Sequence, residues 1–329
     1  MRILSDGAFH SGTEIGQALG VTRAAVSKAV GVLVESGAEI HRVSGRGYRV
    51  PSAFGPLDRE RILECLGADA TLINDLQVVE EVDSTSLELL RMRGTGARGQ
   101  VCMAESQSNG RGRRGRGWIA TPYANLMLSV GWCFDNGISA VAGLSLAAGV
   151  ATARALRAFG VTDAGLKWPN DLMWNERKLG GLLVDLRGEA AGPCLVVVGV
   201  GINGRISERD GPGIGQPWVD LGEILGRTPD RNRLAALLIR ELAQMLRRFG
   251  QEGLAPFREE WIAWHCYQGR RVRLTGAGPD REGVVEGIDQ SGALLVRDDE
   301  GRLAAFHSGE ISLRPAAGVG AAGVGAWRV

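Results

Sequence analysis

The sequence has few of the residues and motifs that mark several common classes of protein. Its 329 residues include five scattered cysteines, without a Cys-x-x-Cys pair, and four histidines. This distribution indicates neither a zinc site nor a disulfide framework, and it fits a reducing compartment. A Gly-x-Ser-x-Gly elbow and a GxxxxGK[ST] loop are also absent, and neither GxGxxG match, at residues 110–115 and 199–204, opens a predicted helix. The serine-hydrolase elbow and both standard nucleotide fingerprints are therefore excluded.

Long apolar segments and an excess of one charge are absent too. The longest apolar run, residues 141–153, is too short to cross a bilayer, and no signal-like apolar core follows Met1. The formal net charge is +1, so overall charge indicates neither a nucleic-acid nor a membrane partner. We expect a soluble cytoplasmic protein with no membrane partner, and its length suggests two or three domains.

Residues 1–50 have the pattern of a small separate unit. A helix is predicted from Thr13 to Gly20, and a second one begins after Thr22, its expected N-cap. A hairpin with a tight turn at residues 44–47 follows. Together these elements predict a winged helix-turn-helix. The residues expected to reach DNA phosphates and base edges are Thr22, Arg23, Ser27, Lys28 and Arg46.

The usual three-helix core of such a unit has one more helix before these two, and here that helix is short. Only residues 2–5 precede Asp6-Gly7, which leaves little more than one turn, and such a helix is unstable without strong packing. We expect the missing turns to leave Ile15, Leu19 and Val30 poorly covered. The alternative to DNA binding is a helical protein-interaction module, and the sequence leaves both open.

A larger unit is predicted from residue 51 onward. Residues 51–56 have the composition of a linker, and residues 58–66 that of a short helix. Strands are expected at residues 77–82, 100–105, 126–134, 178–186 and 194–203, with a further short strand that ends at Pro169. Helices are expected at residues 139–159, 231–249 and 256–265. The Gly/Pro-rich residues 205–217, which precede Trp218, have the composition of a mobile flap.

The end of the chain predicts two further segments. Short strands recur from residue 270 to 314, with turns at 276–280, 289–292 and 298–301, which predicts a small closed barrel. Residues 316–329 repeat Ala-Ala-Gly-Val-Gly and are expected to be disordered. The expected domains are residues 1–50, a linker with a short helix at 51–75, a central domain at 76–266, the barrel at 267–315 and the tail at 316–329.

Residues 110–118 read Gly-Arg-Gly-Arg-Arg-Gly-Arg-Gly-Trp and are hereafter called the Gly-Arg loop. Glycine lets a backbone approach a ligand closely, and arginine offers fork-shaped donors that match carboxylates and phosphates. Because four arginines repel one another, we expect the loop to stay open until an anion neutralises it. The other interpretation is a solvated basic loop or a nucleic-acid patch.

Further cationic and polar side chains are expected near strand ends in the central domain. They are Lys167, Lys178, Ser84, Thr85, Gln107, Asp171 and Asn203. With the Gly-Arg loop, this set suits the joining of two anions, for example a carboxylate and a nucleotide phosphate. The chemistry would rest on positioning and charge screening rather than on a side-chain nucleophile.

Five motifs follow one another in a particular order. They are Asp83-Ser-Thr, Gly110-Arg-Gly-Arg-Arg-Gly-Arg, Lys167-Trp-Pro-Asn-Asp-Leu, Arg177-Lys-Leu-Gly-Gly-Leu-Leu-Val and Gly199-Val-Gly-Ile-Asn. From about residue 8 to 314, their order and spacing resemble the biotin–protein ligases, and the winged N-terminus resembles the bifunctional form, the biotin operon repressor. The different glycine-rich signature of the lipoate ligases is not found.

This resemblance implies an α+β fold in three parts: an N-terminal winged helix-turn-helix, a central mixed-sheet class II synthetase-like ligase domain and a small C-terminal SH3-like β-barrel. It also implies a two-step reaction. The carboxylate of biotin attacks ATP, which enters with Mg²⁺, to give biotinyl-5′-AMP and pyrophosphate. A lysine of the biotin carboxyl carrier protein, a subunit of acetyl-CoA carboxylase, then attacks the mixed anhydride. Biotin would be a substrate and the precursor of a corepressor, and no metal site on the protein is implied.

The resemblance also assigns roles by position. The catalytic residues would be Lys178, Arg113 and Asp171, with Lys178 at the carboxylate and Asp171 aiding either a metal or a lysine. The biotin contacts would be Ser84, Thr85, Ser86, Gln107, Arg111, Gly112, Arg113 and Lys178. The ATP or adenylate contacts would be Arg111, Arg114, Arg116, Trp118, Lys167, Asn203 and Trp218. Ser86 stands where the family more often has Asn.

Structural roles stay open for single residues. Trp118 and Trp168 also suit a core, Asp171 a turn, and Asn203 a hydrogen-bonded strand end. For the whole chain, the leading hypothesis is a ligase that also acts as a biotin-responsive repressor, homodimeric on operator DNA when adenylate is bound. The alternative is a DNA-binding regulator that senses an acyl-adenylate without ligase activity. The intact Lys167, Lys178 and Asp171 favour the enzyme.

Overall fold

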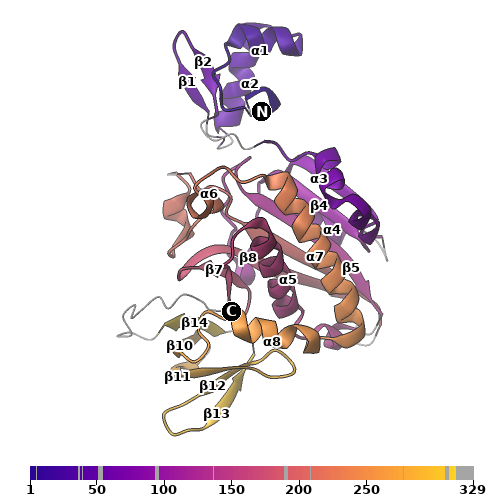
Figure 1. Ribbon diagram of the computed structural model, residues 1–329, viewed down its shortest axis with the longest axis vertical. Helices are drawn as coiled ribbons and strands as arrows, with labels where there is room; N and C mark the ends of the chain where they lie inside the picture. Colours follow the sequence, from indigo (N-terminus) through magenta and orange to yellow (C-terminus); the bar gives the residue numbers. More distant parts are fainter. Residues whose placement is uncertain are drawn as a thin grey trace.

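Three units follow one another along the chain (Figure 1). A small N-terminal unit lies at one end, a central sheet with helices in the middle, and a second sheet at the other end. The computed structural model describes residues 1–4, 6–35, 38, 40–50, 55–92, 96–135, 137–188, 192–207, 209–276, 278–307 and 311–315. Most of the predicted linker and the predicted tail at residues 316–329 lie outside these ranges.

The N-terminal unit has the order of elements that a winged helix-turn-helix requires. Ser11 and Glu14 form a capping box, and the left-handed backbone of Gly20 ends that first helix. The hydroxyl of Thr22 accepts a hydrogen bond from the Ala25 amide and so caps the next helix, as predicted. The elements are η1 (Arg2–Leu4), α1 (Gly12–Leu19), α2 (Arg23–Glu35), β1 (His41–Val43) and β2 (Gly47–Arg49).

The core of this unit is better covered than the sequence suggests. The segment that precedes α1 is indeed a single 3-10 turn, η1. Leu19 is exposed, but Ile15 and Val30 are buried. The prediction that those two would be poorly covered was wrong, because Leu4 and the hairpin residue Tyr48 pack against them. Among the described residues no single helix is long and apolar enough to span a membrane; α1 and α2 reach that length and composition only as a pair bent by 101°.

The central unit is built on a seven-stranded mixed sheet in the order β3-β4-β5-β9-β8-β7-β6. Only β3 and β4 pair in parallel, and the other neighbours are antiparallel. Every residue of β5 is buried, which places this strand in the core. The strands are β3 (Asp75–Val82), β4 (Gln100–Gln107), β5 (Leu126–Phe134), β6 (Gly165–Lys167), β7 (Asp171–Trp174), β8 (Arg177–Gly188) and β9 (Cys194–Ile202).

Helices α5 and α7 pack against each other and against the sheet (Figure 1). The helix expected at residues 139–159 is interrupted, because Gly143 has a left-handed backbone with φ of 78°. A 3-10 turn therefore precedes it, and α5 begins at Leu144. The elements are α3 (Arg59–Leu66), η2 (Gly67–Leu72), α4 (Thr85–Arg91), η3 (Arg113–Gly115), η4 (Ile138–Val141), α5 (Leu144–Phe159), η5 (Gly211–Ile214), α6 (Leu221–Leu225), α7 (Arg231–Glu252) and α8 (Ala255–Trp264).

The C-terminal unit is an antiparallel sheet in the order β13-β12-β11-β10-β14. The turns predicted at residues 289–292 and 298–301 are present, whereas β11 already begins inside the turn predicted at 276–280. The described strands do not test whether this sheet closes into a barrel. The strands are β10 (Arg271–Gly276), β11 (Gly278–Ile288), β12 (Leu294–Arg297), β13 (Leu303–Phe306) and β14 (Ile311–Pro315). The ring nitrogen of Trp168 donates to the carbonyl of Gly292 and ties this unit to the central one.

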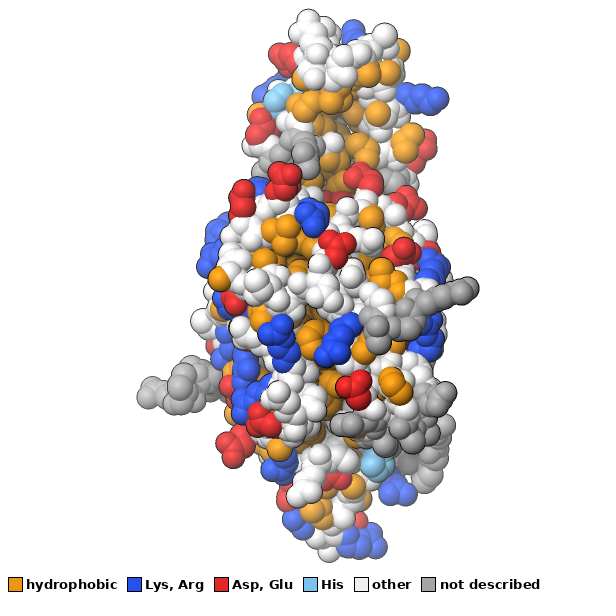
Figure 2. All heavy atoms as spheres, turned by 90° about the vertical axis from the view of Figure 1, so that its right-hand side faces the viewer, with side chains coloured by type: hydrophobic (Ala, Val, Ile, Leu, Met, Phe, Trp, Pro, Cys, Tyr) orange, Lys and Arg blue, Asp and Glu red, His pale blue; other side chains and the backbone are white. Residues whose placement is uncertain are grey.

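The surface carries charges of both signs. Figure 2 shows acidic and basic side chains interspersed with hydrophobic ones over the face in view. This agrees with the net charge of +1.

Candidate active site

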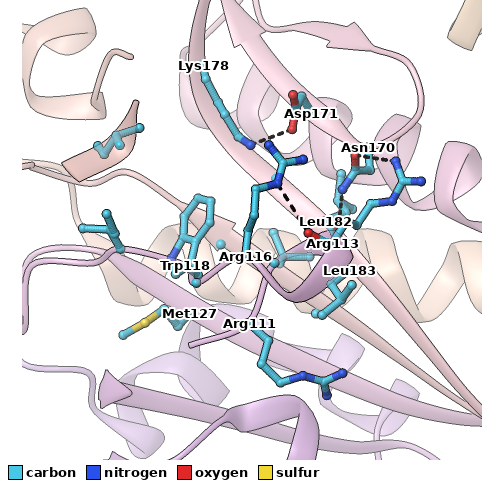
Figure 3. Close-up of a pocket in the computed structure, with 18 of the residues that line it drawn as sticks. Arg111, Arg113, Arg116, Trp118, Met127, Asn170, Asp171, Lys178, Leu182 and Leu183 are labelled. Carbon is cyan, nitrogen blue, oxygen red and sulfur yellow. Dashed lines mark hydrogen bonds and ion pairs between the residues drawn. The ribbon is translucent and has the colours of Figure 1, made fainter. Parts of the chain in front are cut away.

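A cavity of about 390 Å³ lies in the central unit and is lined from several directions. The Gly-Arg loop, the start of α4, the β6–β7 turn, strands β8 and β9 and the segment around η5 all contribute to it (Figure 3). Of the lining residues, seven are lysine or arginine and one, Asp171, is acidic. Such a lining attracts anionic ligands and suits two anions that must approach each other.

A network of hydroxyl groups and an amide forms one wall of the cavity. The backbone N–H of Thr85 donates to Oε1 of Gln107 at 2.8 Å. The hydroxyl oxygen of Ser129 lies 2.8 Å from that of Thr85 and 3.0 Å from that of Ser86. Buried polar groups of this kind offer directional partners to an uncharged polar ligand. Sequence reasoning missed Ser129; a polar residue within the apolar segment 126–134 was the available signal.

Lys178 and Asp171 form an ion pair inside the cavity. The Nζ atom of Lys178 lies 2.7 Å from Oδ1 of Asp171. Asp171 is the first residue of β7, and Lys178 is the second residue of the adjacent strand β8. The backbone of Lys178 is fixed as well, because its N–H donates to Pro217 and its carbonyl accepts from Val219. A metal and a lysine were the two partners expected for Asp171, and the ion pair with Lys178 is compatible with the second. The described residues contain no cluster of three or more His, Cys, Asp or Glu that could hold a metal ion.

The Gly-Arg loop is less open than its sequence predicts, although its arginines still repel one another. The Trp118 amide donates to the carbonyl of Gly110, so the two ends of the loop are closed by a backbone hydrogen bond. The guanidinium of Arg111 pairs with Asp185 at 3.0 Å, and Arg113 donates to Oδ1 of Asn170 at 3.3 Å. The Asp185 carboxylate therefore replaces part of the neutralisation that we expected from a ligand, and the uncharged amide of Asn170 adds a hydrogen bond.

Burial affects the charged groups of the cavity. It lowers the pKa of the Lys167 ammonium, and Asp171 acts in the opposite direction. Burial also lowers the pKa of Arg113, and the nearby Arg114 lowers it further. A bound anion would favour the charged forms of these groups and so oppose both shifts.

The indole of Trp118 lies against the backbone of β9. A Cβ atom added to Gly201 would come within 2.5 Å of the Trp118 ring, so this part of the Gly-Val-Gly motif must be glycine. Asn203 is buried at the end of β9, and its Nδ2 atom donates to the carbonyls of Lys178 and Val219. Asn203 is thus a hydrogen-bonded strand-end amide that also lines the cavity.

The structure brings the predicted site residues of the central unit together, with one exception. All the predicted catalytic and biotin-binding residues line the cavity, and so do the predicted ATP contacts apart from Trp218. The ring of Trp218 instead packs over Gly211, where an added Cβ would lie 2.8 Å from it. Residues that line the cavity but were not predicted include Asn170, Gln216 and Arg314. Arg314 comes from β14, and only the tertiary fold shows that the C-terminal sheet reaches the cavity.

The predicted DNA-contacting residues lie on the surface of the N-terminal unit. Thr22, Arg23, Lys28 and Arg46 are exposed, and Ser27 is half-buried. The guanidinium of Arg46 lies 4.3 Å from the centre of the Phe9 ring, so part of this hairpin side chain is held against the unit.

Comparison with known protein families agrees with this division of the chain. Residues 79–203 match the biotin/lipoate A/B protein ligase family, residues 267–314 the biotin protein ligase C terminal domain, and residues 1–49 an HTH domain. The fold and the cation-lined cavity therefore define a protein ligase of the biotin/lipoate type that carries a helix-turn-helix unit.

Individual relatives make the assignment narrower. A bifunctional ligase/repressor BirA from Escherichia coli is 40% identical over 314 residues, which cover 95% of this chain and 96% of that protein. A biotin–[acetyl-CoA-carboxylase] ligase from Mycobacterium tuberculosis is 36% identical over 78% of this chain and 95% of that protein. A biotin protein ligase from Aquifex aeolicus, solved in complex with biotin and ATP, is 28% identical with a TM-score of 0.64, covering 74% of this chain and 100% of that one. The chain belongs to the biotin protein ligase family.

Proposed function

We propose that this protein is an ATP-dependent biotin ligase that forms biotinyl-5′-AMP and transfers biotin to a lysine of the biotin carboxyl carrier protein. The observation that carries this proposal is the Lys178–Asp171 pair inside a cavity with seven cationic side chains and one carboxylate. The names of the relatives, which include ligases of acetyl-CoA carboxylase and a structure with biotin and ATP, support the choice of substrates.

In the first step, a carboxylate oxygen of biotin attacks the α-phosphorus of ATP. The bond from that phosphorus to the bridging oxygen breaks, and pyrophosphate leaves with both electrons of the bond. We assign Lys178 and Arg113 to the meeting anions, where their charges offset repulsion as negative charge builds up. Asp171 orients Lys178, since their charged atoms are 2.7 Å apart.

Mg²⁺ would enter with the triphosphate. The described cavity has no set of carboxylates that could hold the ion on its own, and phosphate oxygens are the ligands that Mg²⁺ prefers. The ion would supply further charge neutralisation, while the residues of this chain hold the nucleotide.

In the second step, the uncharged ε-amine of the carrier lysine attacks the carbonyl carbon of the anhydride. The carbon–oxygen bond to phosphate breaks, AMP leaves, and the amine loses a proton as the amide forms. No side chain of the ligase becomes covalently bound, which agrees with the absence of a nucleophile motif. Holding the two reactants together is therefore the main contribution of the site.

The two halves of the cavity suggest where the substrates lie. We assign the uncharged ureido ring of biotin to the hydroxyl and amide wall of Ser84, Thr85, Ser86 and Gln107, and its carboxylate to the side of Gly112, Arg113 and Lys178. We assign the nucleotide to Arg114, Arg116, Trp118, Lys167 and Asn203. Arg111 and Trp218 keep a predicted role, although the guanidinium of Arg111 already binds Asp185 and Trp218 lies outside the cavity lining.

The finer fold assignments belong to the same proposal. We propose that the central unit is a class II synthetase-like domain at residues 76–266 and that the C-terminal sheet closes as an SH3-like barrel at residues 267–315. The N-terminal domain would be residues 1–50, followed by a linker and short helix to residue 75.

A second function is favoured by the N-terminal unit. Its winged helix-turn-helix order, covered core and exposed Arg23 and Lys28 support a biotin-responsive repressor, which would bind operator DNA as an adenylate-bound homodimer. Biotinyl-5′-AMP would then be the corepressor. A regulator that senses adenylate without ligase activity is the alternative, and the intact Lys178–Asp171 pair argues against it.

The test of the ligase is the exchange of radiolabelled pyrophosphate into ATP by the purified protein. We expect exchange that depends on biotin and is absent with biotin methyl ester, because the ester lacks the attacking carboxylate. Transfer to a purified apo carrier domain is then followed by its gain in mass. Exchange that is equal with and without biotin, or no exchange at all, would contradict the proposal and leave the adenylate-sensing regulator.

A further inference from the structure

A bidentate ion pair between Arg111 and Asp185 joins the Gly-Arg loop to the sheet. Atom Nη2 of Arg111 lies 3.0 Å from Oδ1 of Asp185, and Nη1 donates to Oδ2 at 3.3 Å. The side chains are 33% and 15% exposed, so the pair is partly shielded from water. Paired contacts of this type are more specific in geometry than a single surface contact and are less screened.

Asp185 lies outside the cavity that holds the groups assigned to the reaction. It lies on β8, on the same strand as Lys178 but seven residues further along, and it is not among the residues that line the cavity. The side chain of Arg111 points away from Lys178 and Asp171 (Figure 3). Any effect of Asp185 on the ligand must therefore pass through the Gly-Arg loop.

The same loop presents ligand-facing groups next to this pair. Gly112 and Arg113 line the cavity, and the backbone N–H of Gly112 donates to Arg116 at 2.7 Å. Arg113 also donates to Asn170, whose own amide donates to the carbonyl of Leu182 on β8. The loop is thus fixed to β8 directly through Asp185 and indirectly through Asn170.

We propose that Asp185 is a positioning residue, which holds Arg111 and thereby keeps the Gly-Arg loop in the conformation that binds biotin. The inference rests on the proposed ligase function and adds to it a residue outside the cavity. Loss of the pair lets the loop sample other conformations before biotin binds, so the apparent Kd for biotin rises by the inverse of the fraction of time that the loop is in place. The chemical step changes little, because the bound loop has the same geometry.

The variant that tests this is Asp185→Asn, which keeps the shape of the side chain and removes its charge. We expect the amides of residues 110–118 to exchange with deuterium about fivefold faster in the ligand-free protein, and KM for biotin in pyrophosphate exchange to rise by about fivefold, with kcat within about twofold. The control is Glu260→Gln, which breaks a pair with Arg154 whose carboxylate is more exposed and which does not line the cavity. It should change neither quantity.

A charge swap separates positioning from ligand contact. The double variant Arg111→Asp with Asp185→Arg restores the pair with its ends exchanged, so deuterium exchange of the loop in the ligand-free protein should return toward wild type. KM is not read from the swap, because Arg111 is itself a predicted ligand contact. Unchanged loop exchange and KM in Asp185→Asn, or loop exchange in the swap as fast as in Asp185→Asn alone, would overturn the proposal. If wild type shows no biotin-dependent exchange, the proposed ligase function fails, while deuterium exchange in the loop still tests the Asp185 contact by itself.

Discussion

Lys178 is held in place by contacts on every side, so its removal is a clean test of charge at the reacting centre. Its ammonium pairs with Asp171 and its backbone with the segment before α6. We expect Lys178→Ala to slow biotin-dependent pyrophosphate exchange by about 10²–10³, the usual cost of losing such a group. Biotin affinity, measured by calorimetry, should fall much less, because the polar wall at Thr85 and Gln107 is intact.

If Lys178 acts in adenylation, its loss must lower the rate of pyrophosphate exchange much more than the affinity for biotin. Lys178→Arg serves as the control, since it keeps the charge but cannot reproduce the compact ammonium and should lie between wild type and Lys178→Ala. An alanine variant within about twofold of wild type in exchange rate would refute the role of Lys178 in adenylation.

His265 should make the protein sensitive to acid. The ring is 1% exposed, stacks on Trp261, and has no hydrogen-bond partner for either nitrogen within the described part of the chain. Burial, and then the charge of Lys167, lowers the pKa of His265 to about 3 from an ordinary value of 6.5. Between these pH values the unfolded chain binds a proton that the folded protein does not. The free energy of unfolding therefore decreases as pH falls below 6.5.

The variant His265→Phe removes this titration and keeps an aromatic ring in the stack. Between pH 6.5 and 5, wild type should lose about 2 kcal/mol more stability than the variant, at about 1.4 kcal/mol per pH unit. Denaturant titrations of both proteins at several pH values measure the difference. Parallel pH profiles would show that His265 is protonated in the folded state.

At the level of elements, local patterns predicted most of the fold. The apolar run that became β5 and the capped starts of α1 and α3 are set by nearby residues, so the sequence alone shows them. The break before α5 was missed, because Gly143 reads as one more small residue in a buried helix. Its left-handed backbone follows from packing against Leu254, where an added Cβ would lie 2.7 Å from that side chain.

The candidate site shows the same division between local and long-range information. The glycine and arginine pattern of residues 110–118 and the position of Lys178 predicted a cation-lined cavity. The partners of those cations could not be predicted, because Asp185 and Asn170 are 74 and 57 residues away from the arginines that they bind. Arg314 reaches the cavity only through the packing of the C-terminal sheet.

The whole Gly-Arg loop should become less accessible to protease when ligand binds. Arg114 and Arg116 are exposed at its tip, where trypsin can cleave, and glycines flank them. We expect biotin, and more so biotin with ATP, to slow cleavage at these positions by several-fold, because ligand orders the loop and covers it. Mass spectrometry of the fragments locates the cuts, and cleavage elsewhere in the chain is the internal control. Equal cleavage at the loop with and without ligand would contradict this coupling.

At the scale of the whole molecule, a buried ion pair connects the predicted linker to the segment that precedes η5. Arg231 and Glu105 are nearly inaccessible and lie 2.6 Å apart. Arg231 also donates to the carbonyls of Gly55, in the linker, and Asn125. The side chain of Asn125 in turn accepts from the backbone of Gly204, at the start of the segment that precedes η5. The linker and that segment thus share one hydrogen-bonded network.

Removal of one member of this pair should be costly. Glu105→Gln leaves a buried guanidinium without its counter-charge, which typically costs about 3–5 kcal/mol. We expect a clear fall in the Tm of the central unit, compared with little change in Glu260→Gln. The double variant Glu105→Met with Arg231→Met should recover part of the loss, because no charge stays buried. A Tm for Glu105→Gln equal to that of wild type would show that water reaches this site.

The proposed repressor role predicts DNA binding that depends on the adenylate. One winged unit with few basic residues is too small for tight specific binding, so the proposed binding would require a symmetric dimer on a two-fold site. Adenylate can raise DNA affinity only as far as it favours that dimer.

On the protein's own upstream DNA, we expect biotin with ATP to strengthen binding over random DNA. Arg23→Ala and Lys28→Ala should each weaken it and lower the salt slope by about one or two ions per dimer. Lys178→Ala, which forms adenylate about 10²–10³ times more slowly, should respond fully to added biotinyl-5′-AMP and much more slowly to biotin with ATP. Affinity equal to that for random DNA under all conditions would leave a ligase whose N-terminal unit, with its covered core around Ile15 and Val30, serves another partner.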